Sequence, residues 1–351
     1  MKRTKLFRMM TSAALTAAMV MTMGGMTAFA EEATVSFTKT LDMTEATNAS
    51  VPDVTFTYTI VPGAAATNAG GREIKAGVGQ PTVGTAAYTY ETATTALTKD
   101  VTVDFSGVTF TAPGIYRYVI TEDAVSADTE VKDDITNDTD TTRYLDVYVR
   151  SEGSGYEIYN YVLLKTLTNP DADGKYEGAP AGKNEGYENK YTTYSLELTK
   201  HVTGDMGETG REFDFTIAFE GPSNATFKLD GTTEVKLDGE GKATVNNIKL
   251  ADGDSATITG IPSSVKYTVT ETAPGDGYTV SHKENEATDY TDGSEVTVEA
   301  MGKKNNTVEF KNNRDAVTPT GIVMSFAPYI LLVALAGVFA VLFLRKRRHE
   351  I

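Results

Sequence analysis

The feature that most constrains the fold is a two-residue alternation of apolar and polar side chains, which recurs in short runs along the chain. Such runs, rich in Val, Thr, Tyr and Phe, occur at 54–60, 101–105, 144–149, 213–219 and 296–298. Successive side chains of a β-strand point to opposite faces, so each run predicts a strand with one buried face. The runs are short and are not separated by segments with a long helical period. The sequence therefore predicts an all-β protein built from two tandem immunoglobulin-like β-sandwich domains.

Turn signals separate these runs and help to place the domains. Pro-Gly and Asp-Gly pairs occur at 62–63, 113–114, 173–174, 230–231, 238–239, 252–253 and 292–293. Such pairs favour tight turns. A loop-rich stretch at 169–186 then marks the approach to a domain boundary. We expect one domain at 31–190 and a second at 191–315, because a segment of this length is sufficient for two domains.

The first 30 residues have the composition of a secretory signal peptide. A basic start is followed by an apolar stretch at 9–23 and by Ala28-Phe29-Ala30, which has small residues at the two positions that a signal peptidase reads. The apolar stretch is short and interrupted by Thr and Ser, which disfavours a transmembrane anchor. We expect cleavage after Ala30.

The C-terminal residues predict a membrane helix with a short motif in front of it. The pentapeptide VTPTG at 317–321 precedes an uncharged apolar segment at 322–344, which is long enough to span a bilayer. Four basic residues at 345–348 follow and would keep that end in the cytoplasm. A plain single-span anchor would not account for the pentapeptide.

Composition narrows the possible partners. The formal net charge is −16 at pH 7, although both ends of the chain are basic, so nucleic acid is an unfavourable partner. There is no cysteine, so an exported protein of this kind has no disulfides to stabilise it. The three histidines lack metal-ligand spacing, and no phosphate loop or nucleophile elbow occurs. We expect no metal, no cofactor and no enzymatic activity.

One pattern of Lys, Glu and Asn occurs twice, in the same order. The first copy is VSFTK ending at Lys39, YVITE ending at Glu122 and YEN ending at Asn189; the second is LELTK ending at Lys200, YTVTE ending at Glu271 and FKN ending at Asn312. By the two-residue period, each of these polar residues shares its strand face with apolar residues. Lysine and glutamate are rarely buried without a partner, so six such positions in two matched sets need a chemical reason.

Burial suggests what that reason is. It shifts lysine towards the neutral amine, which is a nucleophile, and glutamate towards the protonated acid. A buried acid can polarise the carbonyl of an Asn side chain and transfer protons, so the three groups together can form a Lys–Asn amide and release ammonia. The alternative is a buried Lys–Glu ion pair in each domain, with Asn as an ordinary hydrogen-bond partner. Buried pairs often bring no net stability, which disfavours that alternative.

These motifs resemble those of the backbone pilins of streptococci and related Firmicutes, whose immunoglobulin-like domains carry self-generated isopeptide bonds. The stretch YTVTETAPGDGY at 267–278 is similar to the E-box of that family, whereas the first domain keeps the YxxxE core and lacks the PxGY ending. The resemblance covers essentially all of 31–351. It implies a bond from Lys39 to Asn189 with Glu122 as catalyst, and a bond from Lys200 to Asn312 with Glu271 as catalyst.

The C-terminal pentapeptide resembles the cell-wall sorting signal of Gram-positive surface proteins, which a sortase cleaves between Thr and Gly. The resemblance implies a cut between Thr320 and Gly321, although Val replaces the usual Leu and proline is third instead of second. A pilus shaft also needs a lysine that attacks the sortase-bound Thr320 of another subunit. Lys183 fits best, six residues before Asn189, although the usual tyrosine-proline-lysine motif is absent; Lys175 and Lys165 are the alternatives.

The sequence thus predicts the major, or backbone, pilin of a sortase-assembled pilus, secreted and anchored to the cell wall. Its partners would be a sortase, identical subunits and peptidoglycan, while a host surface ligand remains open. The competing interpretation is a monomeric wall-anchored adhesin or a minor pilus subunit. The lean two-domain body favours the shaft, because no large additional domain is left for ligand binding.

Overall fold

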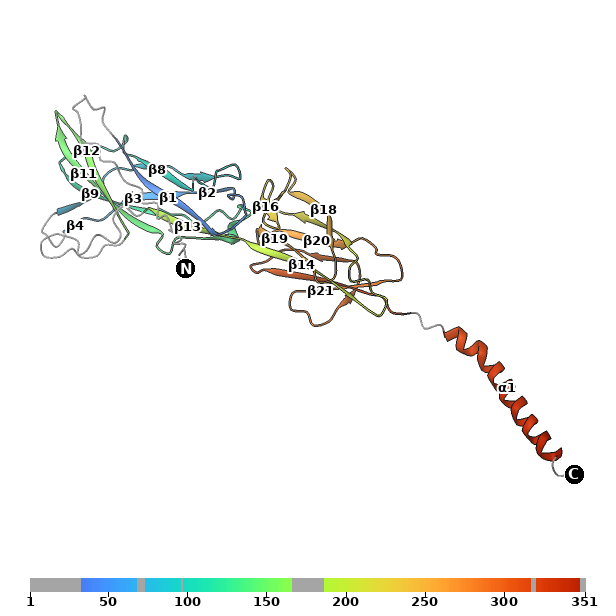
Figure 1. The fold of residues 1–351 in the computed structure, drawn as a ribbon. Coiled ribbons are helices and arrows are strands. Elements are labelled where there is room, and N and C mark those ends of the chain that lie inside the picture. Colours follow the sequence, from blue (N-terminus) through green and yellow to red (C-terminus); the bar gives the residue numbers. More distant parts are fainter. Residues whose placement is uncertain (1–32, 68–72, 96, 166–185, 317–319, 348–351) are drawn as a thin grey trace, which may run out of the picture.

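Two β-sandwiches follow one another along the chain, and an α-helix comes after them (Figure 1). The structure, a computed structural model, describes residues 33–67, 73–95, 97–165, 186–316 and 320–347. The expected signal peptide at 1–30 and the candidate lysines Lys183 and Lys175 lie outside these residues. The predicted all-β fold with two tandem sandwiches is confirmed.

The first sandwich packs a five-stranded sheet in the order β10-β13-β1-β8-β6 against a six-stranded sheet in the order β12-β11-β9-β5-β4, in which β3 also pairs with β9. A separate pair, β2-β7, belongs to the same domain. Apolar residues from both sheets, such as Phe37 and Tyr118, form one core between them. The elements are β1 (Thr34–Glu45), β2 (Val54–Phe56), β3 (Tyr58–Pro62), β4 (Ala66–Thr67), β5 (Glu73–Ala76), β6 (Thr82–Val83), β7 (Ala86–Tyr88), β8 (Thr98–Asp104), β9 (Gly114–Glu122), the 3-10 helix η1 (Lys132–Asp134), β10 (Ile135–Thr136), β11 (Thr142–Glu152), β12 (Gly155–Leu164) and β13 (Tyr187–Thr192).

One predicted strand is divided in the structure. The alternating run at 54–60 forms β2 and β3, which break at Thr57 and pair with different strands, β7 and β9. Asp123, which lies outside the run, stabilises this break. The Thr57 carbonyl accepts a hydrogen bond from the Asp123 backbone N–H, and the Thr57 hydroxyl donates to the Asp123 carboxylate. The alternation of side chains is unchanged across the break, which is why the sequence pattern does not reveal it.

The second sandwich packs a seven-stranded sheet in the order β17-β16-β19-β14-β24-β21-β22 against a four-stranded sheet in the order β18-β15-β20-β23. Its core again combines both sheets, with residues such as Leu198, Phe215 and Val269 buried between them. The strands are β14 (Tyr194–Thr203), β15 (Phe213–Glu220), β16 (Thr226–Leu229), β17 (Thr233–Lys236), β18 (Lys242–Leu250), β19 (Ser255–Ile261), β20 (Lys266–Glu271), β21 (Thr279–Glu284), β22 (Thr291–Asp292), β23 (Glu295–Val298) and β24 (Asn306–Asn313).

The first and last strands of each sandwich lie side by side and run parallel. In the first domain β1 pairs with β13, and Lys39 is opposite Tyr187. In the second, β14 pairs with β24, and Lys200 is opposite Phe310. The Asn of each pattern is therefore two residues beyond the position opposite the Lys in both domains. Because alternate residues of a strand share a face, this offset puts the Lys and the Asn on the same face of neighbouring strands.

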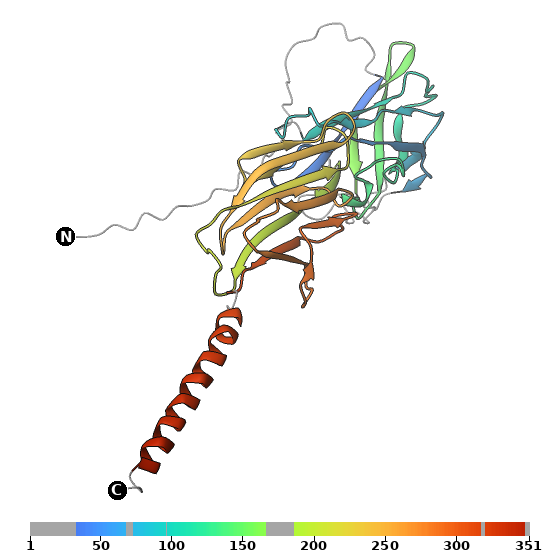
Figure 2. The same cartoon turned by 90° about the vertical axis from the view of Figure 1, so that its right-hand side faces the viewer.

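The two sandwiches are connected closely. Thr193 alone separates the end of β13 from the start of β14. Figure 2 views the molecule from the side of the second sandwich, which there overlaps the first. Ser50 and Thr226 exchange two hydrogen bonds across the junction, of 2.8 Å and 3.0 Å. The Ser263 backbone N–H also donates to the buried carboxylate of Asp134, at 2.9 Å.

The helix α1 (Thr320–Arg347) begins at the residue for which sortase cleavage is expected. Its segment corresponds to the apolar run that the sequence shows before the basic tail. Over the part of the chain that the structure describes, no helix has both the length and the apolar character required to cross a membrane.

Candidate functional site

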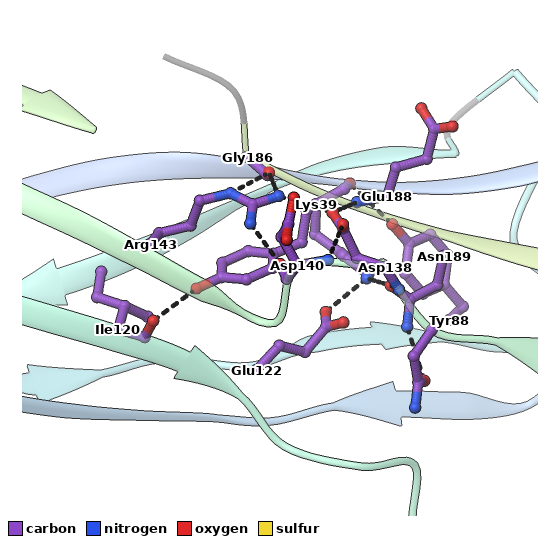
Figure 3. A network of polar contacts seen from close by, with 12 residues as sticks. Lys39, Tyr88, Ile120, Glu122, Asp138, Asp140, Arg143, Gly186, Glu188 and Asn189 are labelled. Atoms are coloured by element: carbon purple, nitrogen blue, oxygen red, sulfur yellow. Dashed lines mark hydrogen bonds and ion pairs between the residues drawn. The ribbon is translucent and has the colours of Figure 1, made fainter. Parts of the chain in front are cut away.

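The structure brings Lys39, Glu122 and Asn189 together in the core of the first sandwich (Figure 3). The Lys39 Nζ donates to Glu122 Oε1 and to Asn189 Oδ1, both at 2.5 Å. Lys39 and Asn189 have no exposed surface, and Glu122 is buried as well. An amine, a carboxyl group and a carboxamide therefore meet in a site from which bulk water is excluded.

The three residues come from both layers of the sandwich. Lys39 and Asn189 point inward from the adjacent strands β1 and β13, whereas Glu122 ends β9 in the opposite sheet. On β1 the buried positions alternate through Val35, Phe37, Lys39 and Leu41. Lys39 therefore lies in the core, because it shares the inward face of β1 with these apolar residues. Its charge must be compensated within the core.

A second copy of this arrangement lies in the core of the second sandwich. Lys200 and Asn312, on β14 and β24, are fully buried, and Glu271 reaches them from β20 in the facing sheet. Here the carboxylate lies between the other two groups. Its Oε1 is 3.2 Å from the Lys200 Nζ and accepts a hydrogen bond of 2.5 Å from the Asn312 Nδ2.

Aromatic rings cover both amines. The Lys39 Nζ lies 4.0 Å from the centre of the Phe56 ring, and the Lys200 Nζ lies 4.6 Å from that of Phe213. A second aromatic residue follows two positions after each of these rings and pairs with the glutamate of its site across neighbouring strands. Tyr58 is opposite Glu122, and Phe215 is opposite Glu271. The rings exclude water and interact favourably with an ammonium through their faces.

Burial changes the proton affinities in the direction that amide formation needs. It lowers the pKa of Lys39 to about 8, although Glu122 acts in the opposite direction. It lowers the pKa of Lys200 to about 8 as well, against the effect of Glu271. Burial also raises the pKa of Glu271, because desolvation outweighs the attraction to Lys200. Each lysine is thus much closer to its nucleophilic neutral form than a lysine in water.

These proton affinities predict a bell-shaped pH dependence for amide formation in the second domain. If Lys200 forms an amide with Asn312, the Lys200–Glu271 pair would need one shared proton, which leaves a neutral Lys200 and a protonated Glu271 after transfer. Raising the pH through about 8 removes that proton from the pair, and lowering it through the raised pKa of Glu271 adds a second proton that keeps the amine charged. The rate, followed by intact mass after timed synthesis of the chain, should fall on both sides. A rate that rises steadily beyond pH 8 would contradict the need for the acid.

A fully buried arginine holds the start of β13 in the first domain. The Arg143 guanidinium donates to the Gly186 carbonyl, at 2.8 Å and 3.0 Å, and to Asp138 Oδ2, at 2.7 Å. It also lies over the Tyr187 ring, with its Cζ 4.5 Å from the ring centre. Arg143 thereby anchors the strand that carries Asn189.

The residues predicted from the sequence did not include Arg143, Asp138, Phe56 or Phe213. One signal was present, because Arg143 shares the two-residue face of Leu145 and Val147 and is buried with them. Its position is as anomalous as that of the two lysines. Asp138 carries no such signal, because it follows the short strand β10 in an irregular segment.

The residues expected to take part in polymerisation are placed only partly. Thr320 and Gly321 begin α1, while Lys183 and Lys175 are outside the described residues. Lys165, the remaining candidate, directly follows β12 and is 29% exposed. Its Nζ is 3.8 Å from Asp138 Oδ1 and 3.7 Å from Asp140 Oδ2.

Two family models match the chain, one for each sandwich. Residues 35–192 match the Spy0128-like isopeptide containing domain. Residues 194–314 match a family described as a domain of unknown function (DUF7601). The two matches meet where β13 ends and β14 begins.

Known proteins that match most of the chain were also found. A pilin of Streptococcus pyogenes serotype M1 is 27% identical over 360 residues, which cover 97% of this chain and 98% of that protein. The crystal structure of a major pilin from Streptococcus pyogenes has a TM-score of 0.64 at 23% identity, covering 81% of this chain and 99% of its own. A second major pilin structure from that species, T3.2, has a TM-score of 0.59 at 27% identity, covering 82% and 99%.

Proposed function

This chain is a backbone pilin of the Gram-positive type, with residues 35–192 belonging to the Spy0128-like isopeptide containing family, and we propose that its copies are linked covalently into the shaft of a surface pilus. The observation that carries the proposal is the pair of buried Lys, Glu and Asn sites. Each site connects the first strand of a sandwich to its last strand. Amides at these positions would tie the first and last strands of each sandwich together and so limit how far a shaft of linked subunits can stretch.

In the proposed reaction, the neutral Lys39 amine attacks the Asn189 Cγ, and Lys200 attacks Asn312 in the same way. A Nζ–Cγ bond forms, the Cγ–Nδ2 bond breaks and one ammonia molecule leaves. The glutamate carboxyl group takes a proton from Nζ and passes it to the departing nitrogen, so it is unchanged at the end. Each site reacts once in the life of the chain, which makes this a maturation step and not enzymatic turnover.

The contacts of the first site place the reactants together. The Lys39 amine is 2.5 Å from Glu122 Oε1 and 2.5 Å from the Asn189 Oδ1. Holding the nucleophile against the carboxamide makes the reaction intramolecular, which is worth many orders of magnitude in effective concentration.

Assembly between subunits would use the C-terminal motif. We propose that a sortase cleaves between Thr320 and Gly321 and transfers Thr320 to a lysine of the next subunit, and that the last subunit is transferred to peptidoglycan. Lys183 remains the preferred acceptor. Lys165 is a weaker candidate, because its side chain is mostly covered and faces Asp138 and Asp140.

The intact mass of residues 31–315 tests the internal bonds. The recombinant protein should be lighter than its sequence by two ammonia molecules, and Glu122→Ala and Glu271→Ala should each restore one of them. A mass equal to that of the unmodified sequence would leave only the buried ion pairs.

An immunoblot of wall extracts boiled in detergent tests polymerisation. We expect a high-mass ladder in wild type that disappears in Lys183→Ala and persists in the control Lys190→Ala, a partly exposed lysine of β13. A ladder that persists in Lys183→Ala would keep the polymer and move the acceptor to Lys175 or Lys165. A single band in wild type would instead favour a monomeric wall-anchored protein.

A further inference from the structure

Besides the predicted triad, a short segment after β10 contacts the reacting carboxamide of the first domain (Figure 3). The Asp138 backbone N–H donates to the Asn189 Oδ1 at 3.2 Å. On the other side of the same amide, the Asn189 Nδ2 donates to the Asn137 Oδ1 at 3.2 Å. The oxygen and the nitrogen of the carboxamide are thus each held by a group of the matching kind.

We propose that Asn137 and the Asp138 backbone N–H form part of the reaction centre for the Lys39–Asn189 bond. When the amine attacks, negative charge develops on Oδ1, and the Asp138 N–H stabilises it as an oxyanion-hole donor does. Asn137 holds the leaving nitrogen as the Cγ–Nδ2 bond breaks. This inference rests on the proposed bond and adds a second catalytic element to it.

The position of the acid shows why such a donor is needed. Glu122 Oε1 is hydrogen-bonded to the amine, and its Oε2 has no hydrogen-bond partner among the residues that the structure describes. In this arrangement the carboxyl group receives the proton of the nucleophile. In the described contacts, the Asn189 Oδ1 accepts hydrogen bonds from the Lys39 Nζ, which is the nucleophile, and from the Asp138 backbone N–H. The Asp138 N–H is therefore the donor that can stabilise charge on Oδ1.

The segment is held in place by contacts of its own. The antiparallel pairing of β10 with β13 puts Thr136 opposite Lys190, so the following residues lie beside Asn189. The Asp138 carboxylate accepts hydrogen bonds from the Glu188 and Asp140 backbone N–H groups and from Arg143. Arg143 is therefore a positioning residue for this donor, since it fixes Asp138 and the start of β13 together.

The same segment offers the ammonia a route out of the core. Asn137 and Asp138 line a surface cavity of about 550 Å³, and Asn137 is exposed to solvent. The Asn189 Nδ2 points towards Asn137, and thus towards this cavity. Ammonia that leaves through this cavity is diluted into the solvent, which disfavours the reverse reaction.

The second domain is differently built and provides an internal control. There Glu271 itself accepts the hydrogen bond of the Asn312 Nδ2, and within the described parts of the chain the buried Asn312 Oδ1 has no hydrogen-bond partner. Changes at positions 137 and 138 should therefore affect the first bond alone.

The test is the rate of each bond in chains 31–315 made in a short cell-free pulse, quenched in acid at timed points and mapped by peptide mass. We expect Asn137→Ala to slow the Lys39–Asn189 bond by about tenfold, because the leaving amide loses its alignment. An α-hydroxy acid in place of Asp138 replaces the N–H with an ester oxygen and should slow it on the order of a hundredfold to a thousandfold. The Lys200–Asn312 bond should keep its rate in both variants.

Two further variants separate this role from a loss of folding. Asn137→Asp keeps an acceptor for the Asn189 Nδ2 and should restore the rate, and Thr139→Ala, in the wall of the same cavity, should leave it unchanged. Wild-type rates for the first bond in both Asn137→Ala and the α-hydroxy variant would overturn the inference. A wild-type chain that never forms the Lys39–Asn189 product would overturn the proposed bond itself, and this inference with it.

Discussion

Pulled from its two ends, the mature two-domain chain is expected to show no unfolding step. Force would enter β1, cross to β13 through the Lys39–Asn189 amide, continue into β14 and cross to β24 through the Lys200–Asn312 amide. The residues between each Lys and its Asn, 150 positions apart in the first pair, are outside that path. Covalent bonds would carry the load, so the hydrogen bonds between the strands would bear no pulling force.

Removing one catalytic acid should release one domain. Because an extended residue spans about 3.4 Å, Glu122→Ala should lengthen by roughly 500 Å in a single step, and Glu271→Ala by roughly 380 Å. Single-molecule pulling measures both lengths directly. The matched controls are Glu188→Ala and Glu197→Ala, exposed residues on β13 and β14 that should leave the chain inextensible. A wild-type chain that extends by either length would show that the corresponding bond is absent.

Glu122→Ala should also lower the melting temperature of the first domain by at least about 10 °C. Closing a loop of this size covalently is worth about 5 kcal/mol through the entropy of the unfolded chain. For a domain of this length, each kcal/mol corresponds to about 2–4 °C. The variant further leaves the buried Lys39 without its carboxylate, which adds to the loss. Differential scanning calorimetry on the 31–315 chain measures the shift, and Glu188→Ala is the matched control.

Asn189→Ala separates the covalent bond from the ion pair. It removes the carbon that the amine attacks but keeps Lys39 and Glu122 in contact. If the amide stabilises the domain, Asn189→Ala should melt at least about 10 °C below wild type, by the same loop-closure argument. A variant that melts with wild type would show that the ion pair alone accounts for the stability of the site.

Much of this protein follows from local patterns. The two-residue alternation indicated the all-β class, because a strand with one buried face leaves that mark on any sequence, and the two-sandwich fold is confirmed. The resemblance to backbone pilins, carried by the repeated motifs, is confirmed as well. The same alternation assigned all six Lys, Glu and Asn residues to buried faces, where the structure places them. Their bonds and roles stay predictions.

Contacts between distant segments could not be read in this way. The alternation at 54–60 continues across the break at Thr57, which only the bonds to Asp123 reveal. Nothing local indicates that β1 pairs in parallel with β13, or that Glu122 approaches from the other sheet.

What the sequence by itself determined, then, is which side chains are buried, because the period of a strand is a property of a few consecutive residues. Only the tertiary structure decided which of these side chains meet and what surrounds them. The two sites have the same motif, yet Asn189 is held by Asn137 and Asp138 whereas Asn312 is held by Glu271. Asn137 and Asp138 follow the short strand β10, which pairs with β13 in the first sandwich. The pairing of strands depends on the packing of the whole domain.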